Sequence, residues 1–271
     1  MKKEEDDREL ISVVVTVKNE AANIRDLLDS LVSQEPPIEV LIIDAASTDG
    51  TQDIVRSYQK KYPFIKLKQY AAQRGESRNK GIRMAEGSIV AFTDGDCIAN
   101  PFWAKEIRRS IRDSPIVGGK TLAMGYEPFR NLGRVEVYYK GYDITFPSCN
   151  LAYRKEVLDR IGGFDPRFVT AEDIDLNYRA VDAGFGIVEN PHMVVYHRER
   201  STIVTFFKQA FWNGFGRKQL TTKHGSLWGS YKPGEMLEKQ IGFWWLTRTL
   251  VALMGYFSYL MAHPRYQIRR S

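Results

Sequence analysis

The stretch that decides the fold is "SIVAFTDGDC", residues 88–97. Its first half is apolar and rich in β-branched residues, a pattern typical of a strand that is buried on both faces. The strand then ends in two aspartates, Asp94 and Asp96, on either side of Gly95. Two carboxylates held this close repel one another unless a cation or a proton lies between them. The stretch therefore predicts a buried strand whose carboxyl end carries a polar site.

Upstream of this stretch, predicted strands and helices alternate. Strands are expected at 11–17, 39–44 and 65–70, and helices at 19–34, 51–62 and 76–87. The first two strands read as the continuous apolar runs "ISVVVTV" and "EVLIID", whereas the first helix places Ile24, Leu27 and Leu31 at helical spacing. This alternation predicts an α/β fold, a Rossmann-like, mostly parallel sheet with helices on both faces.

Polar residues also follow the first two strands of the predicted sheet. They are Lys18, Asn19 and Glu20 after the first strand, and Asp44 and Ser47 at and after the second. Ligands of open α/β sheets bind at the carboxyl ends of the strands. These side chains are therefore expected near Asp94 and Asp96, where a nucleotide would bind.

Beyond Pro101 the alternation becomes looser. A helix is expected at 102–114, a strand at 116–124, a strand and a helix within 150–164, a helix within 171–185 and a last strand at 186–199. The stretch from the strand at 116–124 to about Phe146 shows no clear pattern. No repeat or linker requires a break, so residues 1–220 are expected to form one domain and residues 221–271 a helical extension.

Composition indicates a globular chain in a reducing setting. With 271 residues and 43% hydrophobic residues, the chain is long enough for one large core or two modest ones. Its two cysteines are too few for a disulfide framework, and "MKKEEDDREL" contains no apolar core of a signal peptide. We therefore expect a cytoplasmic protein.

The charge is distributed unevenly along the chain. From Asn213 onward, nine Lys and Arg stand against two Glu, a net charge of +7, so the first 212 residues contribute −1 to the total of +6. A neutral body with a basic tail favours an anionic surface, such as a membrane, as the partner of the tail. No nucleic-acid partner is expected.

Several motifs together resemble glycosyltransferase family 2. They are "SVVVTVKNEAANI", "LIIDAASTDGT", "RNKGI" followed by "GSIVAFTDGDC", and "GGFDPRFVTAEDIDLNYRAVDAGF", and they span roughly residues 10 to 220. The resemblance implies the GT-A fold and transfer of a sugar from a nucleotide diphosphate sugar, with Mn²⁺ or Mg²⁺ and inversion at the anomeric carbon. A UDP-sugar is the favoured donor and a GDP-sugar the other choice.

The resemblance also implies a nucleotide-sugar pocket. Its residues would be Val17, Asn19, Glu20, Asp44, Ser47, Arg78, Asp94 and Glu172. Asp44 would contact the base, Arg78 the phosphates or the sugar, and Asp94 the ribose. The chain departs from the family at Ala45, where a second aspartate is common, and this bears on the donor's identity. Without the resemblance, Asp44 would be read as opening an Asx-turn and Arg78 as a solvated helix residue.

Two further roles come from the same resemblance. Asp96 and His197 would bind the metal, and Asp173 would be the base that takes the proton from the acceptor hydroxyl. Each has a structural alternative. Thr170 to Asp173 also reads as a capping box, and a lone histidine is more often structural than a ligand.

The tail leaves two interpretations open. "GFWWLTRTLVALMGYFSYLMA", residues 242–262, is interrupted by Arg248, so a full membrane crossing is marginal. The segment either lies in a membrane interface, with the protein peripheral on the cytoplasmic face, or packs on its own domain or a second subunit. Gln209 is not followed by the Arg-Trp pair of processive synthases, so transfer of a single sugar is expected.

The sequence thus favours an inverting, metal-dependent glycosyltransferase that acts on an acceptor hydroxyl, on a lipid-linked acceptor or a growing glycan. The alternative is a protein that binds a nucleotide-sugar, or serves as a membrane scaffold, without catalysis. A scaffold has no need of a base opposite a metal site, and this favours the enzyme.

Overall fold

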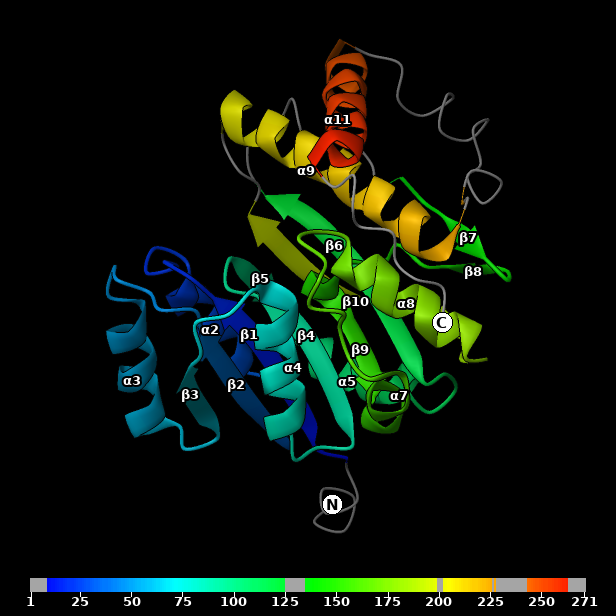
Figure 1. Ribbon diagram of the computed structural model, residues 1–271. Helices are drawn as coiled ribbons and strands as arrows, with labels where there is room; N and C mark the ends of the chain where they lie inside the picture. The colour runs from blue at the N-terminus through cyan, green and yellow to red at the C-terminus, as the bar shows by residue number, and fades with distance from the viewer. Residues whose placement is uncertain (1–8, 125–134, 199–201, 226, 228–242, 263–271) are drawn as a thin grey trace.

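An eight-stranded sheet is found within the residues that the computed structural model describes, which are 9–124, 135–198, 202–225, 227 and 243–262 (Figure 1). Its strands follow the order β3-β2-β1-β4-β9-β6-β10-β5. Their bounds are β1 Ile11–Val17, β2 Ile38–Asp44, β3 Ile65–Gln69, β4 Ile89–Asp94, β5 Cys97–Ala99, β6 Ile116–Met124, β9 Leu151–Arg154 and β10 Ile187–Arg198. The short strands β7 (Tyr138–Tyr139) and β8 (Tyr142–Asp143) form a separate ribbon.

The sheet is mostly parallel, as predicted. β3, β2, β1 and β4 pair in parallel, and so do β6 and β10, whereas β9 runs antiparallel between β4 and β6. The register places Val17 of β1 opposite Asp44 of β2, and Thr16 opposite Asp94 of β4. The polar residues predicted to share one edge of the sheet therefore do so.

Helices cover both faces of the sheet. They are α2 (Ile24–Val32), α3 (Thr51–Lys61), α4 (Arg74–Met84), α5 (Trp103–Ser110), α7 (Lys155–Ile161) and α8 (Glu172–Asp182), with a short 3₁₀ turn, η1, at Ser148–Asn150. One buried cluster joins Val13 of β1 to Leu27 of α2, and a second joins Val14 to Ile82 of α4. Successive residues of β1 thus enter opposite cores, which explains the continuous apolar run in the sequence.

Two differences from the sequence prediction bear on the site. The helix expected from residue 19 begins at Ile24, because Asn19 has a left-handed φ of 56° and the next residues form a loop. β5 was not predicted at all. It pairs antiparallel with β10 and places Cys97 opposite His197.

Two long helices lie over the carboxyl edge of the sheet (Figure 1). α9 spans Ile203–His224 and α11 spans Phe243–Ala262, and they pack closely together. A Cβ atom at Gly214 of α9 would overlap the carbonyl of Ala252, and one at Gly255 of α11 would overlap the carbonyl of Phe211. α9 continues through residue 220, the expected domain boundary, and that division remains a prediction.

α11 packs on α9 of its own chain. The interpretation in which the tail packs on its own domain therefore holds for the side of α11 that faces α9. Among the described helices, none is both long enough and apolar enough to cross a membrane. Most of the rest of the predicted 221–271 extension, including Arg265, Arg269 and Arg270, lies outside the described residues.

Candidate active site

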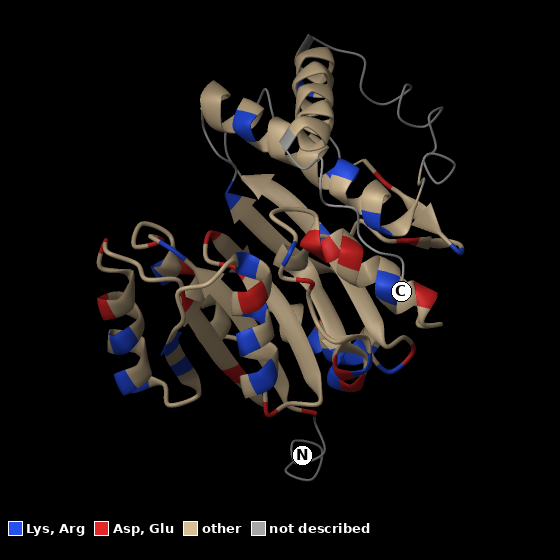
Figure 2. Cartoon of the chain, viewed as in Figure 1, with Lys and Arg blue, Asp and Glu red and all other residues tan. Residues whose placement is uncertain are grey.

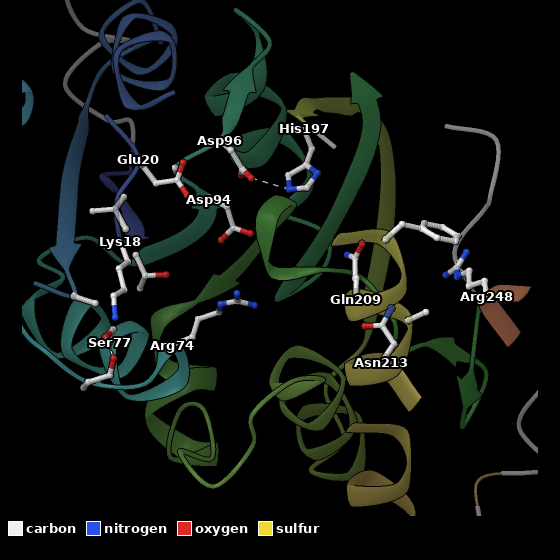
Figure 3. Close-up of a pocket in the computed structure, with 17 residues that line it drawn as sticks. Lys18, Glu20, Arg74, Ser77, Asp94, Asp96, His197, Gln209, Asn213 and Arg248 are labelled. Atoms are coloured by element: carbon white, nitrogen blue, oxygen red, sulfur yellow. Dashed lines mark hydrogen bonds and ion pairs between the residues drawn. The ribbon is translucent and has the colours of Figure 1, made fainter. Parts of the chain in front are cut away.

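A cavity of about 540 Å³ opens at the carboxyl edge of the sheet (Figure 3). Val17 of β1, Asp94 of β4 and His197 of β10 line it, together with Glu20 and Asp96 from the loops that follow β1 and β4. Five of the residues predicted from sequence therefore meet in one cavity.

Asp96 and His197 form a candidate metal site. Oδ1 of Asp96 lies 3.4 Å from Nε2 of His197, as the dashed line in Figure 3 shows. The antiparallel pairing of β5 with β10 creates this proximity, because it places His197 beside the residue that follows Asp96. A carboxylate with an imidazole suits Mn²⁺, and carboxylate oxygen also suits Mg²⁺. These side chains fit the divalent ion expected from the sequence.

Cys97 is the third potential ligand nearby. Ligand atoms of Asp96, Cys97 and His197 all lie within 4.8 Å of one another. The neighbouring Cys149 and burial raise the pKa of the Cys97 thiol, and metals bind thiolates rather than thiols. Mg²⁺ and Mn²⁺ prefer oxygen and nitrogen ligands to sulfur, so Asp96 and His197 are the candidate ligands, and such an ion would take its other ligands from water or phosphate.

Arg78 joins two acidic motifs inside the protein. Its Nη2 donates to Asp94 at 3.0 Å and its Nη1 donates to Glu172 at 2.7 Å. Burial disfavours ionisation of Asp94, but the Arg78 guanidinium holds the pKa of this carboxyl below its usual value. The alternative of a solvated helix arginine is wrong, because Arg78 is buried. Glu172 is also buried, and its carboxylate faces Arg78 rather than the first cavity.

Asp173 occupies the first turn of α8 and remains partly exposed. Its Oδ2 accepts a hydrogen bond from the backbone N–H of Ser148 at 3.2 Å, and Oδ1 accepts one from that of Ile174 at 2.9 Å. Burial, and next the negative charge of Glu172, raise the pKa of Asp173. A fixed carboxylate with a raised pKa is suited to accept a proton.

The predicted capping box at the start of α8 is not formed. The N-cap is Ala171, with a left-handed φ of 62°, and no side chain caps the helix there. The structural alternative for Thr170 is therefore wrong. Asp173 instead binds the N–H of its immediate neighbour Ile174, and its second oxygen is directed to Ser148.

Asn19, Ser47 and Asp44 hold the loops beside the first cavity rather than line it. The N–H of Asn19 donates to Oγ of Ser47 at 2.8 Å, and Oδ1 of Asp44 accepts the N–H of Ser47 at 3.0 Å. The second bond is the Asx-like turn considered from sequence. Oδ2 of Asp44 is buried, and none of the described residues donates to it. One carboxylate oxygen is thus buried beside the first cavity without a donor among the described residues.

Gly95 lies close against side chains of the loop after β1 and of β1 itself. A Cβ atom there would lie 3.0 Å from side-chain carbons of both Glu20 and Val17. Glu20 is half-buried, and burial together with the charges of Asp96 and Asp94 raises its pKa. The glycine between the two aspartates therefore lets three acidic side chains approach one another.

A second, larger cavity of about 1630 Å³ adjoins the first. Asp173 and Ser148 lie on its wall, and Asp94 and His197 line both cavities. The candidate metal site and the candidate base thus face connected spaces, with Asp94 between them.

Some lining residues were not singled out as site residues from the sequence. They are Arg74 and Ser77 of α4, Gln209 and Asn213 of α9, and Arg248 of α11. Arg74 lines both cavities, and its Nη1 lies 3.6 Å from Glu172. The signal for Arg248 was present in the sequence as the one charge in an otherwise apolar helix.

Comparisons with protein families place these motifs in context. The model of "Glycosyl transferase family 2" matches residues 12–170, and that of "Glycosyltransferase like family 2" matches residues 136–216. Glycosyltransferase AglE of Haloferax volcanii is 31% identical over 206 residues, which cover 70% of this chain and 67% of that protein. A Methanococcus voltae enzyme is 25% identical over 251 residues, 79% of this chain and 74% of its own length. Its name is dolichyl N-acetyl-alpha-D-glucosaminyl phosphate 3-beta-D-2,3-diacetamido-2,3-dideoxy-beta-D-glucuronosyltransferase.

Solved structures share the fold. The mannosyltransferase PcManGT of Pyrobaculum calidifontis, in complex with GDP-Man and Mn²⁺, has a TM-score of 0.64 at 21% identity and covers 96% of this chain and 76% of its own. TarS of S. aureus, in complex with UDP-GlcNAc, has a TM-score of 0.60 at 21% identity. The match covers 92% of this chain and 81% of the TarS chain. These likenesses confirm the predicted architecture.

Proposed function

Because this chain belongs to glycosyltransferase family 2 and is a glycosyltransferase, we propose that it moves one sugar from a nucleotide diphosphate sugar to an acceptor hydroxyl, with a divalent metal and with inversion. One observation carries the proposal. Asp94 and His197 line both the cavity that holds the Asp96–His197 pair and the cavity that holds Asp173. A donor and an acceptor bound in these two spaces would meet at Asp94. The non-catalytic alternative is set aside, since this family and the relatives are named as glycosyltransferases.

The first cavity is the proposed donor site. Val17, Glu20 and Asp94 would contact the nucleoside, with Asn19 and Ser47 holding the adjoining loop. The buried Oδ2 of Asp44 could accept a base N–H, which supports a uracil or guanine ring that carries such a donor. We favour a UDP-sugar and keep a GDP-sugar as the other choice.

Asp96 and His197 are the proposed metal ligands, with Mn²⁺ or Mg²⁺ as the ion. When bound, such an ion neutralises developing charge on the leaving diphosphate. Arg78 acts through its neighbours, because it fixes the orientation of Asp94 and keeps this carboxylate ionised. Arg74 is the exposed cation at the junction of the two cavities, where it can contact the diphosphate or the sugar.

Asp173 is the proposed base. Its carboxylate would accept the proton of the acceptor hydroxyl while the acceptor oxygen bonds to the anomeric carbon and the nucleoside diphosphate leaves from the opposite face. The hydrogen bond from the N–H of Ser148 fixes one carboxylate oxygen. The raised pKa makes the Asp173 carboxylate a stronger proton acceptor, because it moves the pKa toward the operating pH. Inversion would follow from this single displacement.

The acceptor is proposed to be lipid-linked, with a growing glycan as the other choice, and the protein to be cytoplasmic and peripheral on an anionic membrane surface. α11 presents a continuous exposed apolar face. It consists of Leu246, Leu250, Leu253, Met254, Phe257, Leu260 and Met261. The basic residues that follow α11 in the sequence, Arg265, Arg269 and Arg270, would complement anionic lipid headgroups.

Two measurements test the donor and the stereochemistry. Calorimetric titration with UDP, GDP, ADP and CDP in the presence of Mn²⁺ should show selective binding of one of the first two. NMR of the product formed from an α-linked donor should show a β-linkage. Binding of none of the four nucleotides, or retention of the α-configuration, would contradict the proposal.

Pelleting with liposomes tests the membrane contact. The wild-type protein should sediment with vesicles that contain anionic phosphatidylglycerol, and a Leu250→Asp, Phe257→Asp variant should remain in the supernatant. Lys155→Ala, on α7, is the control for a surface change elsewhere. Equal sedimentation of all three proteins would exclude α11 as the contact.

A further inference from the structure

α11 has three faces, and each meets a different environment. One face packs on α9 through Gly255 and Tyr259, and a second is the exposed apolar face described above. The third lines the second cavity. It includes Trp245, Arg248, Thr249, Ala252, Leu253 and Tyr256, which follow the i, i+3, i+4, i+7, i+8, i+11 pattern of one side of a helix. Ala252 borders the face that packs on α9, and Leu253 borders the exposed face. α11 is therefore a wall of the candidate active site as well as a surface helix.

Arg248 is the one charged residue of α11. Its side chain is half-buried and lines both cavities. Figure 3 shows it next to Asn213 and Gln209 of α9, on the side of the first cavity away from Lys18 and Ser77. The side chain therefore presents a positive charge to the space that the two cavities share.

The cavity wall around Arg248 is both basic and aromatic. Lys208 and Arg217 of α9 line the same cavity, as do the indole rings of Trp212 and Trp245. Figure 2 shows basic residues along α9 and acidic residues at the start of α8. Cations on one wall with apolar rings beside them are complementary to a phosphate that carries an apolar chain.

We propose that Arg248 binds a phosphate group, and that this phosphate belongs to an acceptor with an apolar chain lying along α11. This inference rests on the proposed function, whose acceptor site it specifies. Arg248 faces the space that also contains Asp173, so a phosphate held by Arg248 would anchor the acceptor within reach of the base. The apolar chain could pass from the cavity to the exposed face of the same helix, where a bilayer would receive it.

The test uses decyl phosphate and decanol, below their aggregation concentrations, as probes of the intact protein. Trp212 and Trp245 line the cavity, so tryptophan fluorescence reports binding. Wild-type protein should bind decyl phosphate about 10- to 100-fold more tightly than decanol, as expected for a charge-assisted hydrogen bond. Arg248→Leu should remove this preference, and Arg248→Lys should restore part of it. Arg109→Leu, which removes an exposed arginine of α5, should leave it unchanged.

Three outcomes would overturn the inference. The first is equal binding of the two probes by wild-type protein, and the second is an equal preference in Arg248→Leu and Arg109→Leu. The third is an Arg248→Leu variant that loses affinity for the nucleoside diphosphate but keeps the preference for decyl phosphate. Arg248 would then bind a phosphate of the donor rather than of the acceptor. Circular dichroism confirms that each variant is folded. Failure of the proposed function would appear separately, as a wild-type protein that binds no nucleotide with Mn²⁺.

Discussion

Arg78 Nη1 lies 2.7 Å from Glu172 Oε1, and the two side chains are only 2% and 4% exposed. The other guanidinium nitrogen donates to Asp94, so one buried cation joins the end of β4 to the first turn of α8. This connection sets the distance between the proposed donor site and the helix that carries Asp173.

Replacement of Arg78 should therefore destabilise the protein. Arg78→Met would leave the Glu172 carboxylate buried without its main cation, a change that typically costs about 3–5 kcal/mol. Urea unfolding of the wild type and the variant measures the free energy of unfolding. The double variant Arg78→Met, Glu172→Gln should recover part of the loss. A difference below about 1 kcal/mol would show that the pair contributes little.

Replacement of Asp173 should affect turnover and spare donor binding. Asp173→Asn keeps the size of the side chain but removes the proton acceptor, so kcat should fall by about 10²- to 10⁴-fold. The pKa of Asp173 is raised above the ordinary value of 3.8, so kcat/KM of the wild type should decline with acid at a pH above that value. Nucleotide affinity measured by calorimetry should be unchanged. Wild-type turnover by this variant would remove Asp173 from the mechanism.

An ionic cluster fastens the end of α9 to α8. Asp175, two residues after Asp173, is fully buried and accepts hydrogen bonds from Lys223 at 2.6 Å and His224 at 2.7 Å, while Arg179 lies at 2.8 Å. Burial opposes its ionisation, but these partners, His224 first, lower the pKa of Asp175 below 3.8. The stability that the charge contributes is therefore present above about pH 4 and is lost as the pH falls through the lower, folded-state pKa.

The prediction compares two proteins across pH. Asp175→Asn should be less stable than the wild type by about 3–5 kcal/mol at pH 7, and the gap should narrow as the pH falls below 4. Urea unfolding at a series of pH values measures the gap. Asp159→Asn, at an exposed aspartate of α7, is the matched control. A gap independent of pH would show that the Asp175 charge is not responsible.

The contact between α9 and α11 depends on two glycines. Gly255→Val should force the helices apart, because the added atoms would occupy the space of the Phe211 carbonyl, and overpacking of this kind costs about 1–3 kcal/mol. Because Arg248 lies two turns earlier on α11, the variant should also weaken decyl phosphate binding. Leu250→Val, on the exposed face, should change neither the melting temperature nor the affinity for decyl phosphate. A normal melting temperature for Gly255→Val would exclude this tight contact.

The fold was predictable because its signals are local. The strand 11–17 was predicted with the bounds it has, since an almost continuous apolar run marks a buried strand. The strand 116–124 also has its predicted bounds, although its apolar residues are interrupted by Gly118 to Thr121. The meeting of Asp94, Asp96 and His197 followed from strand ends sharing an edge and from the family resemblance.

The rest depends on contacts between distant segments. β5 has only three residues, too short for a periodic signal, yet it brings His197 to Asp96. Arg248 enters the site because Gly214 and Gly255 let two helices meet, and periodicity within either helix does not reveal this pairing. The burial of Arg78 likewise depends on its contacts with Asp94 and Glu172, which are distant from it in the sequence.

The most direct test of the account is release of nucleoside diphosphate from a panel of UDP- and GDP-sugars with Mn²⁺ and an acceptor preparation. Wild-type protein should turn over one donor, chelation of the metal should stop the reaction, and Asp96→Ala and Asp173→Asn should each slow it at least about 100-fold. Arg109→Leu should react at the wild-type rate. Turnover that persists without metal, or in both aspartate variants, would contradict the assignment of this site.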